Sequence, residues 1–322
     1  MSLHDGIFNV RDYGAKGNGI HDDTVAIQAA VNQPHQPRSP NRGTIYFPVG
    51  TYRITSPIIF AQNLNIACLG DPGATISGNF GDFLLRRVQE GRLESTHSIE
   101  NLQLLNRHER GRGIALHGCV GRITNCYVSA WRGIESYNSQ SILVDTCKFV
   151  GPKASRSSVG ILAGSATSVT SLTISGYEHG IRHHNVGLNV CGGSFNANAV
   201  GIMIGIDENG NNFQSRGFNI TGVSMESNQT GIHVSNGVGG AISGVSIGGG
   251  TQMDYGLRLG SCQNTVVQSV VVRGKQGFKR AGIAIEIPTR TTFIGVRSLS
   301  RTAWSLPATR RLELAFLQTN RP

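Results

Sequence analysis

The chain has 322 residues, of which 39% are hydrophobic, 15% are charged and 43 are glycine. The glycines have no every-third spacing, which excludes collagen, and the apolar fraction argues against disorder. A formal net charge of +10 favours polyanionic partners, and uronate-containing polysaccharide and nucleic acid both qualify. No apolar stretch approaches the roughly 20 residues of a membrane span, so no membrane partner is expected. The six cysteines lack zinc-site or disulfide-framework spacing, which indicates buried thiols.

The first element in chain order is a short helix, predicted from Thr24 to Val31. Its apolar residues recur at helical spacing, at Val25, Ala26, Ala29 and Ala30. Asp22 and Asp23 precede it, where carboxylates suit the positive end of the helix dipole. We expect this helix to cap the first strands, and we interpret the two aspartates as cap and turn residues.

From residue 99 onward a six-residue phrase of β-branched and small residues recurs every 21 to 30 residues. The copies are IENLQL (Ile99), ITNCYV (Ile123), VDTCKF (Val144), VTSLTI (Val169), VCGGSF (Val190), ITGVSM (Ile220), ISGVSI (Ile242), VQSVVV (Val267) and FIGVRS (Phe293). A second phrase, glycine followed by Ile or Leu, lies between these copies. These second phrases begin at Gly113, Gly133, Gly160, Gly180, Gly201, Gly231, Gly256 and Gly282.

Each repeat therefore holds at least two short strands with period-2 alternation, separated by Gly, Asn or Ser turns. Stacking equivalent strands about 4.8 Å apart pairs every strand above and below, so that unpaired edges remain only at the ends. The sequence predicts an all-β parallel coil with a short N-terminal capping helix. We expect one structural domain, with the cap and first strands in residues 1–60, coils in 61–308, and a C-terminal cap or tail in 309–322.

The opening segment Phe8 to Val31, FNVRDYGAKGNGIHDDTVAIQAAV, is followed by GTIYFPVGTYRI from Gly43 to Ile54. Both segments resemble the pectate-lyase-like superfamily, which includes pectate lyases, polygalacturonases and tailspike depolymerases. The resemblance implies a single-stranded right-handed parallel β-helix, or solenoid, and a function on polysaccharide. It does not assign a reaction, because the matching segment is a structural cap and one fold hosts many chemistries.

The sequence also departs from named members of that superfamily. Alginate epimerases typically carry Asp-Pro-His after a Tyr-Gly pair, whereas Arg-Gly-Ile-Glu-Ser-Tyr stands here from Arg132 to Tyr137. The Asn-Thr-Asp and Gly-His-Gly set of polygalacturonases is not found either. No cluster of aspartates on successive rungs indicates calcium-dependent cleavage, so no cofactor is predicted, and a divalent cation is not indicated by the sequence.

Alternate positions after each phrase glycine should face outward, in two columns. The ionisable and aromatic residues of these columns concentrate in the middle repeats, at Glu135, Tyr137, Arg182, His184, His233 and Arg258. Such a row would line one groove suited to a chain of sugars. The neighbouring His183 should instead point inward as a core histidine. An insertion from Asp207 to Asn212 begins on the same side and contributes Asp207 and Glu208.

These residues allow two reactions, which the sequence leaves open. β-Elimination needs a cation, a base and an acid, for which Arg182 or Arg258, His184 or His233, and Tyr137 are candidates. Hydrolysis needs two carboxyl groups, for which Glu135 with Asp207 or Glu208 are candidates. We assign Glu135, Tyr137, His184, Asp207 and Glu208 as candidate catalytic residues, and Arg182, His233 and Arg258 as candidate substrate-binding residues, with no metal ligand.

The sequence thus favours an enzyme that cleaves polysaccharide, by lyase or glycoside hydrolase chemistry. The alternative is a non-catalytic glycan-binding adhesin or tailspike-like module that only grips the sugar. The expected partner is a polysaccharide or oligosaccharide, and nucleic acid is not expected, because few aromatic residues are arranged for base stacking. A homotrimer and an extracellular or virion-associated location follow from the resemblance alone. Met1 to Val10 lacks the core of a signal peptide.

Overall fold

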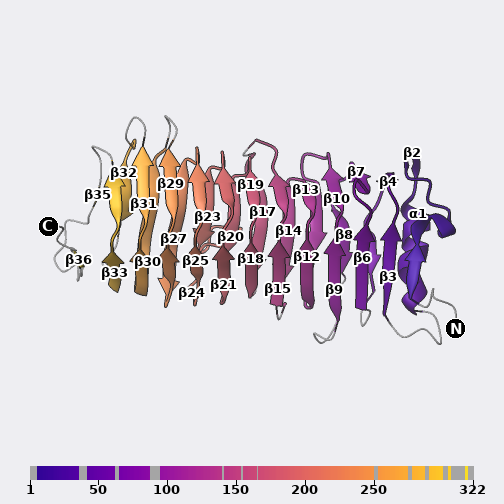
Figure 1. Ribbon diagram of the computed structural model, residues 1–322, viewed down its shortest axis with the longest axis horizontal. Helices are drawn as coiled ribbons and strands as arrows, with labels where there is room; N and C mark the ends of the chain where they lie inside the picture. Colours follow the sequence, from indigo (N-terminus) through magenta and orange to yellow (C-terminus); the bar gives the residue numbers. More distant parts are fainter. Residues whose placement is uncertain are drawn as a thin grey trace. The chain divides into compact units, whose positions relative to one another are not determined.

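A computed structural model describes residues 6–35, 42–61, 65–87, 95–139, 141–153, 155–164, 166–249, 253–274, 278–286, 290–299, 304–305 and 316–317. The chain is an all-β, right-handed parallel β-solenoid of about nine turns (Figure 1). It divides into two compact units, Met1–Pro152 and Lys153–Pro322, and each is described by itself. The predicted fold class is confirmed. The expected limits at residues 60 and 308 remain predictions.

Unit 1 contains three ladders of parallel strands, one strand of each ladder per turn. The first ladder holds β5 (Ile58–Phe60), β8 (Phe83–Arg87), β11 (Arg112–Ala115) and β14 (Arg132–Tyr137). The second holds β1 (Ile7–Asn9), β3 (Arg42–Phe47), β6 (Asn65–Gly70), β9 (Thr96–Glu100), β12 (Val120–Thr124) and β15 (Ser141–Asp145). The third holds β2 (Asn18–Asp22), β4 (Thr51–Ile54), β7 (Thr75–Gly78), β10 (Gln103–Asn106), β13 (Tyr127–Ser129) and β16 (Lys148–Val150).

Unit 2 repeats the three-ladder plan. The first ladder holds β17 (Val159–Gly164), β20 (His179–His183), β23 (Val200–Ile204), β27 (Thr230–Val238), β30 (Tyr255–Gln268), β32 (Ala281–Ile285) and β35 (Trp304–Ser305). The second holds β18 (Thr167–Thr170), β21 (Leu188–Cys191), β24 (Ser215–Arg216), β25 (Asn219–Thr221), β28 (Ala241–Ser243), β33 (Arg290–Ile294) and β36 (Phe316–Leu317), joined by the ends of β27 and β30. The third holds β19 (Thr173–Ser175), β22 (Ser194–Asn196), β26 (Ser224–Glu226), β29 (Ser246–Gly249), β31 (Val271–Gly274) and β34 (Arg297–Leu299).

The six-residue phrase contains a tight turn between a second-ladder and a third-ladder strand. Its third residue adopts a left-handed conformation, with φ of 59° at Asn101, 52° at Asn125 and 51° at Thr146. Asparagine and glycine tolerate this conformation best, which explains why they recur at this position. In unit 1 the amide of Asn125 donates to Asn101 Oδ1 at 2.8 Å, so that successive turns are tied together.

The N-terminal helix α1 spans Thr24–Asn32, one residue longer than the predicted Thr24–Val31, and the short 3₁₀ turns η1 (Val10–Tyr13) and η2 (Gln33–His35) flank it. Its predicted apolar stripe is wrong in detail. The buried residues are Thr24, Ile27, Ala30 and Val31, whereas Val25 is 81% exposed. The buried face of α1 packs against β5 and η1, and it contains Ile27 rather than Val25.

Asp22 and Asp23 serve the local turn structure, as expected. Asp22 accepts hydrogen bonds from the backbone N–H of Thr24 and from the Thr55 hydroxyl at 2.6 Å. Asp23 accepts from the backbone N–H groups of Lys16 and Gly17 at 2.7 and 3.0 Å. The two carboxylates therefore fix the start of α1 and the preceding loop.

The core is formed by inward-facing apolar residues of all three ladders, such as Ile99, Ile134, Ile181 and Ile232, which are fully buried. Five of the six cysteines are buried thiols, and Cys191 is exposed. No helix in the described part of the chain is long and apolar enough to cross a membrane. The predicted C-terminal cap lies outside the described residues, apart from β36.

A pair of buried asparagines ties three turns of unit 2. Asn228 Oδ1 accepts from the backbone N–H of Asn198 at 3.0 Å, and its amide donates to the Phe195 carbonyl at 2.7 Å. Asn198 Oδ1 in turn accepts from the backbone N–H of Tyr177 at 3.0 Å. The asparagines satisfy backbone groups that are inaccessible to water.

We expect Asn228→Ala to lower the free energy of unfolding by about 2–4 kcal/mol, because it leaves a buried N–H and a buried carbonyl unsatisfied. Chemical denaturation followed by circular dichroism measures the change. Asn219→Ala is the matched control, because the exposed Asn219 donates to the side chain of Asn189 and accepts from the Thr221 hydroxyl, both at the surface. A loss for Asn228→Ala no larger than that of the control contradicts this account of the buried pair.

Candidate functional site

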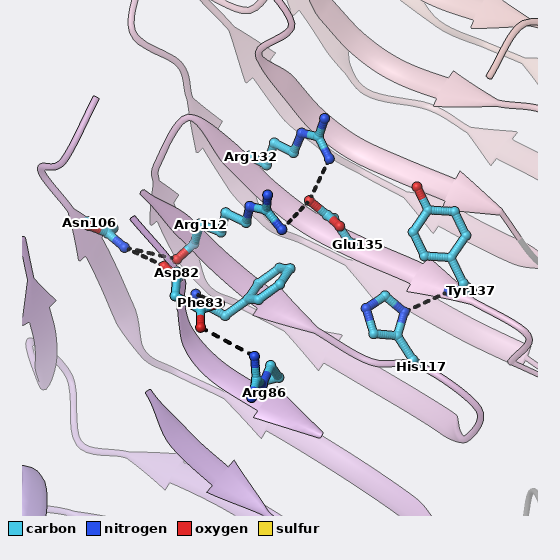
Figure 2. A network of polar contacts seen from close by, with 9 residues as sticks. All are labelled: Asp82, Phe83, Arg86, Asn106, Arg112, His117, Arg132, Glu135 and Tyr137. Atoms are coloured by element: carbon cyan, nitrogen blue, oxygen red, sulfur yellow. Dashed lines mark hydrogen bonds and ion pairs between the residues drawn. The ribbon is translucent and has the colours of Figure 1, made fainter. Parts of the chain in front are cut away.

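The outer face of β8, β11 and β14 in unit 1 carries a cluster of charged and aromatic side chains that includes the predicted site residues Glu135 and Tyr137 (Figure 2). Strand register aligns Phe83 with Arg112 and Arg132 in one column. A second column aligns Arg86, Ala115 and Glu135. We call this surface the unit 1 face.

Glu135 lies between two arginines from adjacent turns. Its Oε1 is 3.0 Å from Arg132 Nη1 and 3.9 Å from Arg112 Nη1. The Glu135 side chain is 5% exposed and that of Arg132 12%, whereas Arg112 remains 34% exposed. One buried carboxylate thus positions two guanidinium groups, and Arg112 is the more accessible to a ligand.

Aromatic rings surround these cations. The Arg112 guanidinium lies 5.1 Å from the ring centroid of Phe83 and 6.0 Å from that of Trp131. The Arg132 guanidinium lies 4.6 Å from the centroid of Trp131. Such cation–π contacts stabilise the charged guanidinium groups and restrict the conformations of their side chains. The arginines are therefore preorganised for a planar anionic group.

His117 and Tyr137 lie at the other end of the same strands. Their rings stack with centroids 5.2 Å apart and an interplanar angle of 20°. The backbone N–H of Tyr137 donates to His117 Nδ1 at 3.1 Å, so in the neutral ring the proton is on Nε2. This assigned tautomer makes His117 a hydrogen-bond donor at Nε2.

Asn106 and Asp82 fix the start of the face. The Asn106 amide donates to the carbonyls of Asp82 and Arg112 at 2.9 and 3.2 Å, which ties β8 to β11. The Asp82 carboxylate forms an ion pair of 3.2 Å with Arg86. Figure 2 shows these contacts beside the arginine cluster.

In unit 2 the predicted column is confirmed by strand register. Arg182 aligns with Met203, then with His233 and Arg258. The column is more buried than the sequence suggests, with Arg182 9% and His233 8% exposed. Burial, helped by the nearby Arg258, lowers the pKa of His233 to about 4, although Glu286 opposes this. Arg258 Nε donates to Glu286 Oε1 at 2.7 Å.

His183 and His184 differ as expected. His183 is fully buried, as expected of a core histidine, and its ring nitrogens lie 2.9 Å from the Ala163 carbonyl and 3.0 Å from that of Asn185. The neutral ring has one N–H, so it can donate to one of these two carbonyls. His184 is partly exposed, and its ring centroid lies 5.8 Å from that of Phe213, the residue that follows the predicted insertion. Burial lowers the pKa of His184 against the opposing charges of Asp207 and Glu208.

The Asp207 carboxylate forms hydrogen bonds within its own loop. Its Oδ1 accepts from the backbone N–H groups of Asn209 and Asn211 at 2.9 and 2.7 Å, and its Oδ2 accepts from the Asn211 amide at 2.9 Å. Burial would raise the pKa of this carboxyl, but these hydrogen bonds lower it below its ordinary value. Asp207 therefore organises the turn, and Glu208 is the more exposed carboxylate of the pair.

The predicted site residues fall on both units. Glu135 and Tyr137 belong to the unit 1 face, and Arg182, His184, Asp207, Glu208, His233 and Arg258 lie in unit 2. Sequence reasoning missed Phe83, Arg112, Trp131 and the role of Arg132. The repeated Arg-Gly-Ile, at Arg112 and again at Arg132, was the signal that could have found the arginines. Within the described ranges no three His, Cys, Asp or Glu side chains form a group able to hold a metal ion.

Buried histidines make the stability of unit 2 depend on pH. Burial lowers the pKa of His179 to about 3 and that of His183 and His233 to about 4, from an ordinary value near 6.5. Between these values the unfolded chain binds more protons, so stability is lost as the pH falls from about 6.5 to about 4. We expect His233→Gln to reduce this slope by up to about one proton, as measured by urea unfolding at several pH values. An unchanged slope contradicts the prediction.

The winding, the three ladders and the cap define the chain as a pectate-lyase-like right-handed β-helix protein. Within that class it belongs to the rhamnogalacturonase A/epimerase, pectate lyase-like family, whose sequence model matches residues 7–211. The match includes the whole unit 1 face.

Curated relatives match over shorter segments. Mannuronan C5-epimerase AlgE1 of Azotobacter vinelandii is 48% identical over 48 residues, which cover 15% of this chain and 3% of that protein. Alginate lyase 7 of the same organism is 33% identical over 99 residues, covering 28% and 11%. Non-secreted LysM effector LysM19 of Penicillium expansum is 45% identical over 71 residues, covering 20% and 6%. The matched part is thus about a tenth or less of each relative's length.

Solved structures share the fold over nearly the full chain. Endo-xylogalacturonan hydrolase of Aspergillus tubingensis has a TM-score of 0.71 at 11% identity, covering 97% of this chain and 99% of that one. The surface adhesin PfbA of Streptococcus pneumoniae has a TM-score of 0.65 at 15% identity, covering 95% and 96%. An enzyme and an adhesin therefore resemble this backbone similarly, and the fold alone does not distinguish between them.

Proposed function

We propose that the chain binds an acidic polysaccharide on the unit 1 face and cleaves it there. The observation that carries the proposal is the Glu135 carboxylate placed between Arg112 and Arg132. A planar guanidinium matches a carboxylate in a bidentate geometry, which makes arginine suited to uronate recognition. The net charge of +10 attracts a polyanion to the surface.

β-Elimination suits the unit 1 face better than hydrolysis. Elimination needs a cation at the uronate carboxylate, a base for the C5 proton and an acid for the departing oxygen. Arg112 can supply the cation. The Tyr137 phenolic oxygen is our candidate to take the C5 proton and pass it to the departing oxygen, as the C4–O bond breaks and the C4=C5 double bond forms. Hydrolysis draws on two available carboxyl groups. Glu135 is engaged by two arginines, so its role here is to position them.

The family and the named relatives support a polysaccharide ligand. The description of the family names rhamnogalacturonase A and an epimerase, and the relatives that match include an alginate lyase and mannuronan epimerases. These activities belong to those proteins, and their transfer to this chain is our proposal. A homotrimeric assembly also remains a prediction, which light scattering of the purified chain can test.

The test is incubation with a panel of acidic and neutral polysaccharides. Unsaturated uronate products, detected by ultraviolet absorbance, together with new reducing ends on acidic substrates support the proposal. New reducing ends without unsaturated products would show that the chain cleaves its substrate by hydrolysis and not by elimination. Cleavage of neutral glycans alone, or neither binding nor cleavage of any acidic glycan, would contradict it.

The second candidate function is a glycan-binding module without catalysis. The same ion pairing favours it, because the buried carboxylate of the unit 1 face is committed to its arginines. It predicts saturable binding of acidic oligosaccharides in calorimetry, with no product after long incubation.

The predicted residues of unit 2 form a separate candidate site for the same class of ligand. Glu208 and His184 are its accessible groups, since Asp207 is used by its turn. His184→Ala and Glu208→Gln, assayed beside Arg112→Ala, assign activity to one unit. Loss of turnover only in the unit 2 variants would move the site away from the unit 1 face.

A further inference from the structure

The interior of unit 1 contains an arginine, Arg87, that forms no ion pair with any carboxylate among the residues that the structure describes. Arg87, the last residue of β8, is 1% exposed. Its Nε donates to the Ser95 hydroxyl at 2.9 Å, its Nη1 donates to the His117 carbonyl, and its Nη2 has no hydrogen-bond partner. No carboxylate in the described part of the chain forms an ion pair with it. Within the described ranges this buried positive charge has neutral partners alone.

A second buried polar group lies beside it. His97 of β9 is fully buried, and neither of its ring nitrogens has a hydrogen-bond partner. Its ring stacks on Phe60, with centroids 5.5 Å apart and an interplanar angle of 15°. Phe60 is also the register partner of Arg87 on the adjacent turn. Burial, with a smaller effect of Arg87, lowers the pKa of His97 to about 4, so the ring is neutral at pH 7.

Such an arrangement is costly unless something compensates it. An uncompensated buried charge and unsatisfied buried donors destabilise a fold, and native proteins rarely retain either. Arg87 Nη2 offers two N–H groups, and neutral His97 offers one. Donors of this kind together with one positive charge match a monovalent anion.

We propose that unit 1 binds a small monovalent inorganic anion, of the size of chloride or bromide, inside its coil between Arg87 and His97. The apolar Phe60 ring forms one wall of the site, which favours weakly hydrated halides over strongly hydrated anions. The anion compensates Arg87, which in turn holds the carbonyl of His117 behind the unit 1 face. This binding is independent of the proposed polysaccharide reaction.

Thermal unfolding of the full chain in sodium bromide, sodium chloride and sodium gluconate at equal ionic strength tests the site. Halide at about ten times its Kd should raise Tm by about 2–4 °C relative to gluconate. Arg87→Met should abolish this difference. Arg122→Met, which removes an exposed arginine of β12, should retain it. Anomalous diffraction from crystals grown in bromide should give a peak within hydrogen-bonding distance of Arg87 Nη2.

His97→Phe keeps the stacking on Phe60 and removes the ring nitrogens, so it tests the site if Arg87→Met does not fold. A reduced halide effect in His97→Phe supports the proposal. An equal halide effect in the wild type, Arg87→Met and His97→Phe, without a bromide peak, overturns it. Halide-independent stability of the wild type, with no bromide peak near Arg87 Nη2, would also overturn it.

Discussion

Arg112→Ala should lower kcat/KM on an acidic polysaccharide by about 10²–10³-fold, which is the usual effect of removing one preorganised charge-stabilising group. Arg112 is the exposed guanidinium of the Glu135 cluster, and its removal leaves Arg132 buried beneath Trp131. Initial rates of product formation measure the change, and circular dichroism verifies folding.

Two further variants make this prediction specific. Arg122→Ala removes an exposed arginine of the second ladder and should leave the rate within about two-fold. Arg112→Lys keeps the charge without the planar fork, so it should recover only part of the activity. A full rate in Arg112→Ala, or equal losses in Arg112→Ala and Arg122→Ala, would exclude a specific carboxylate contact at Arg112.

Glu135→Ala should lower the free energy of unfolding by about 3–5 kcal/mol, because it removes the carboxylate that forms an ion pair with the buried Arg132 guanidinium. Chemical denaturation gives the loss. Exposed Glu109→Ala is the matched control and should change stability by less than about 0.5 kcal/mol.

The double variant Glu135→Leu with Arg132→Leu distinguishes pairing from simple loss of packing. Replacing both partners by apolar residues should recover most of the stability, since no buried charge remains unpaired. If the double variant is as unstable as the sum of its single variants, the ion pair is not the source of the effect.

Much of the fold follows from local sequence patterns. The phrase beginning at Ile99 places Ile99, Leu102 and Leu104 inside, and its third residue, Asn101, takes the left-handed turn. The interval between phrases fixes the register, so the alignment of Arg182, His233 and Arg258 could be read in advance. The helix α1 was also predictable, although Ile27 rather than Val25 is buried.

The candidate site was only partly predictable, for two physical reasons. Gly113 faces inward, where a Cβ would meet the Gly133 carbonyl at 2.4 Å, and this interrupts simple alternation. The residue before the glycine, Arg112, therefore shares the outer face with Ala115, and a reading that starts at the glycine misses it. The second reason is that a loop carboxylate can bind its own backbone. Asp207 accepts hydrogen bonds from the N–H groups of Asn209 and Asn211, and the composition of the loop does not predict which of its carboxylates does so.

The most direct test of the central claim is a crystal structure of the chain with an acidic oligosaccharide. Our account predicts a sugar carboxylate within hydrogen-bonding distance of the Arg112 guanidinium, with a ring lying near Tyr137. An ordered oligosaccharide that contacts neither residue, with Arg112 and Glu135 unchanged, would contradict the assignment of the unit 1 face as the site.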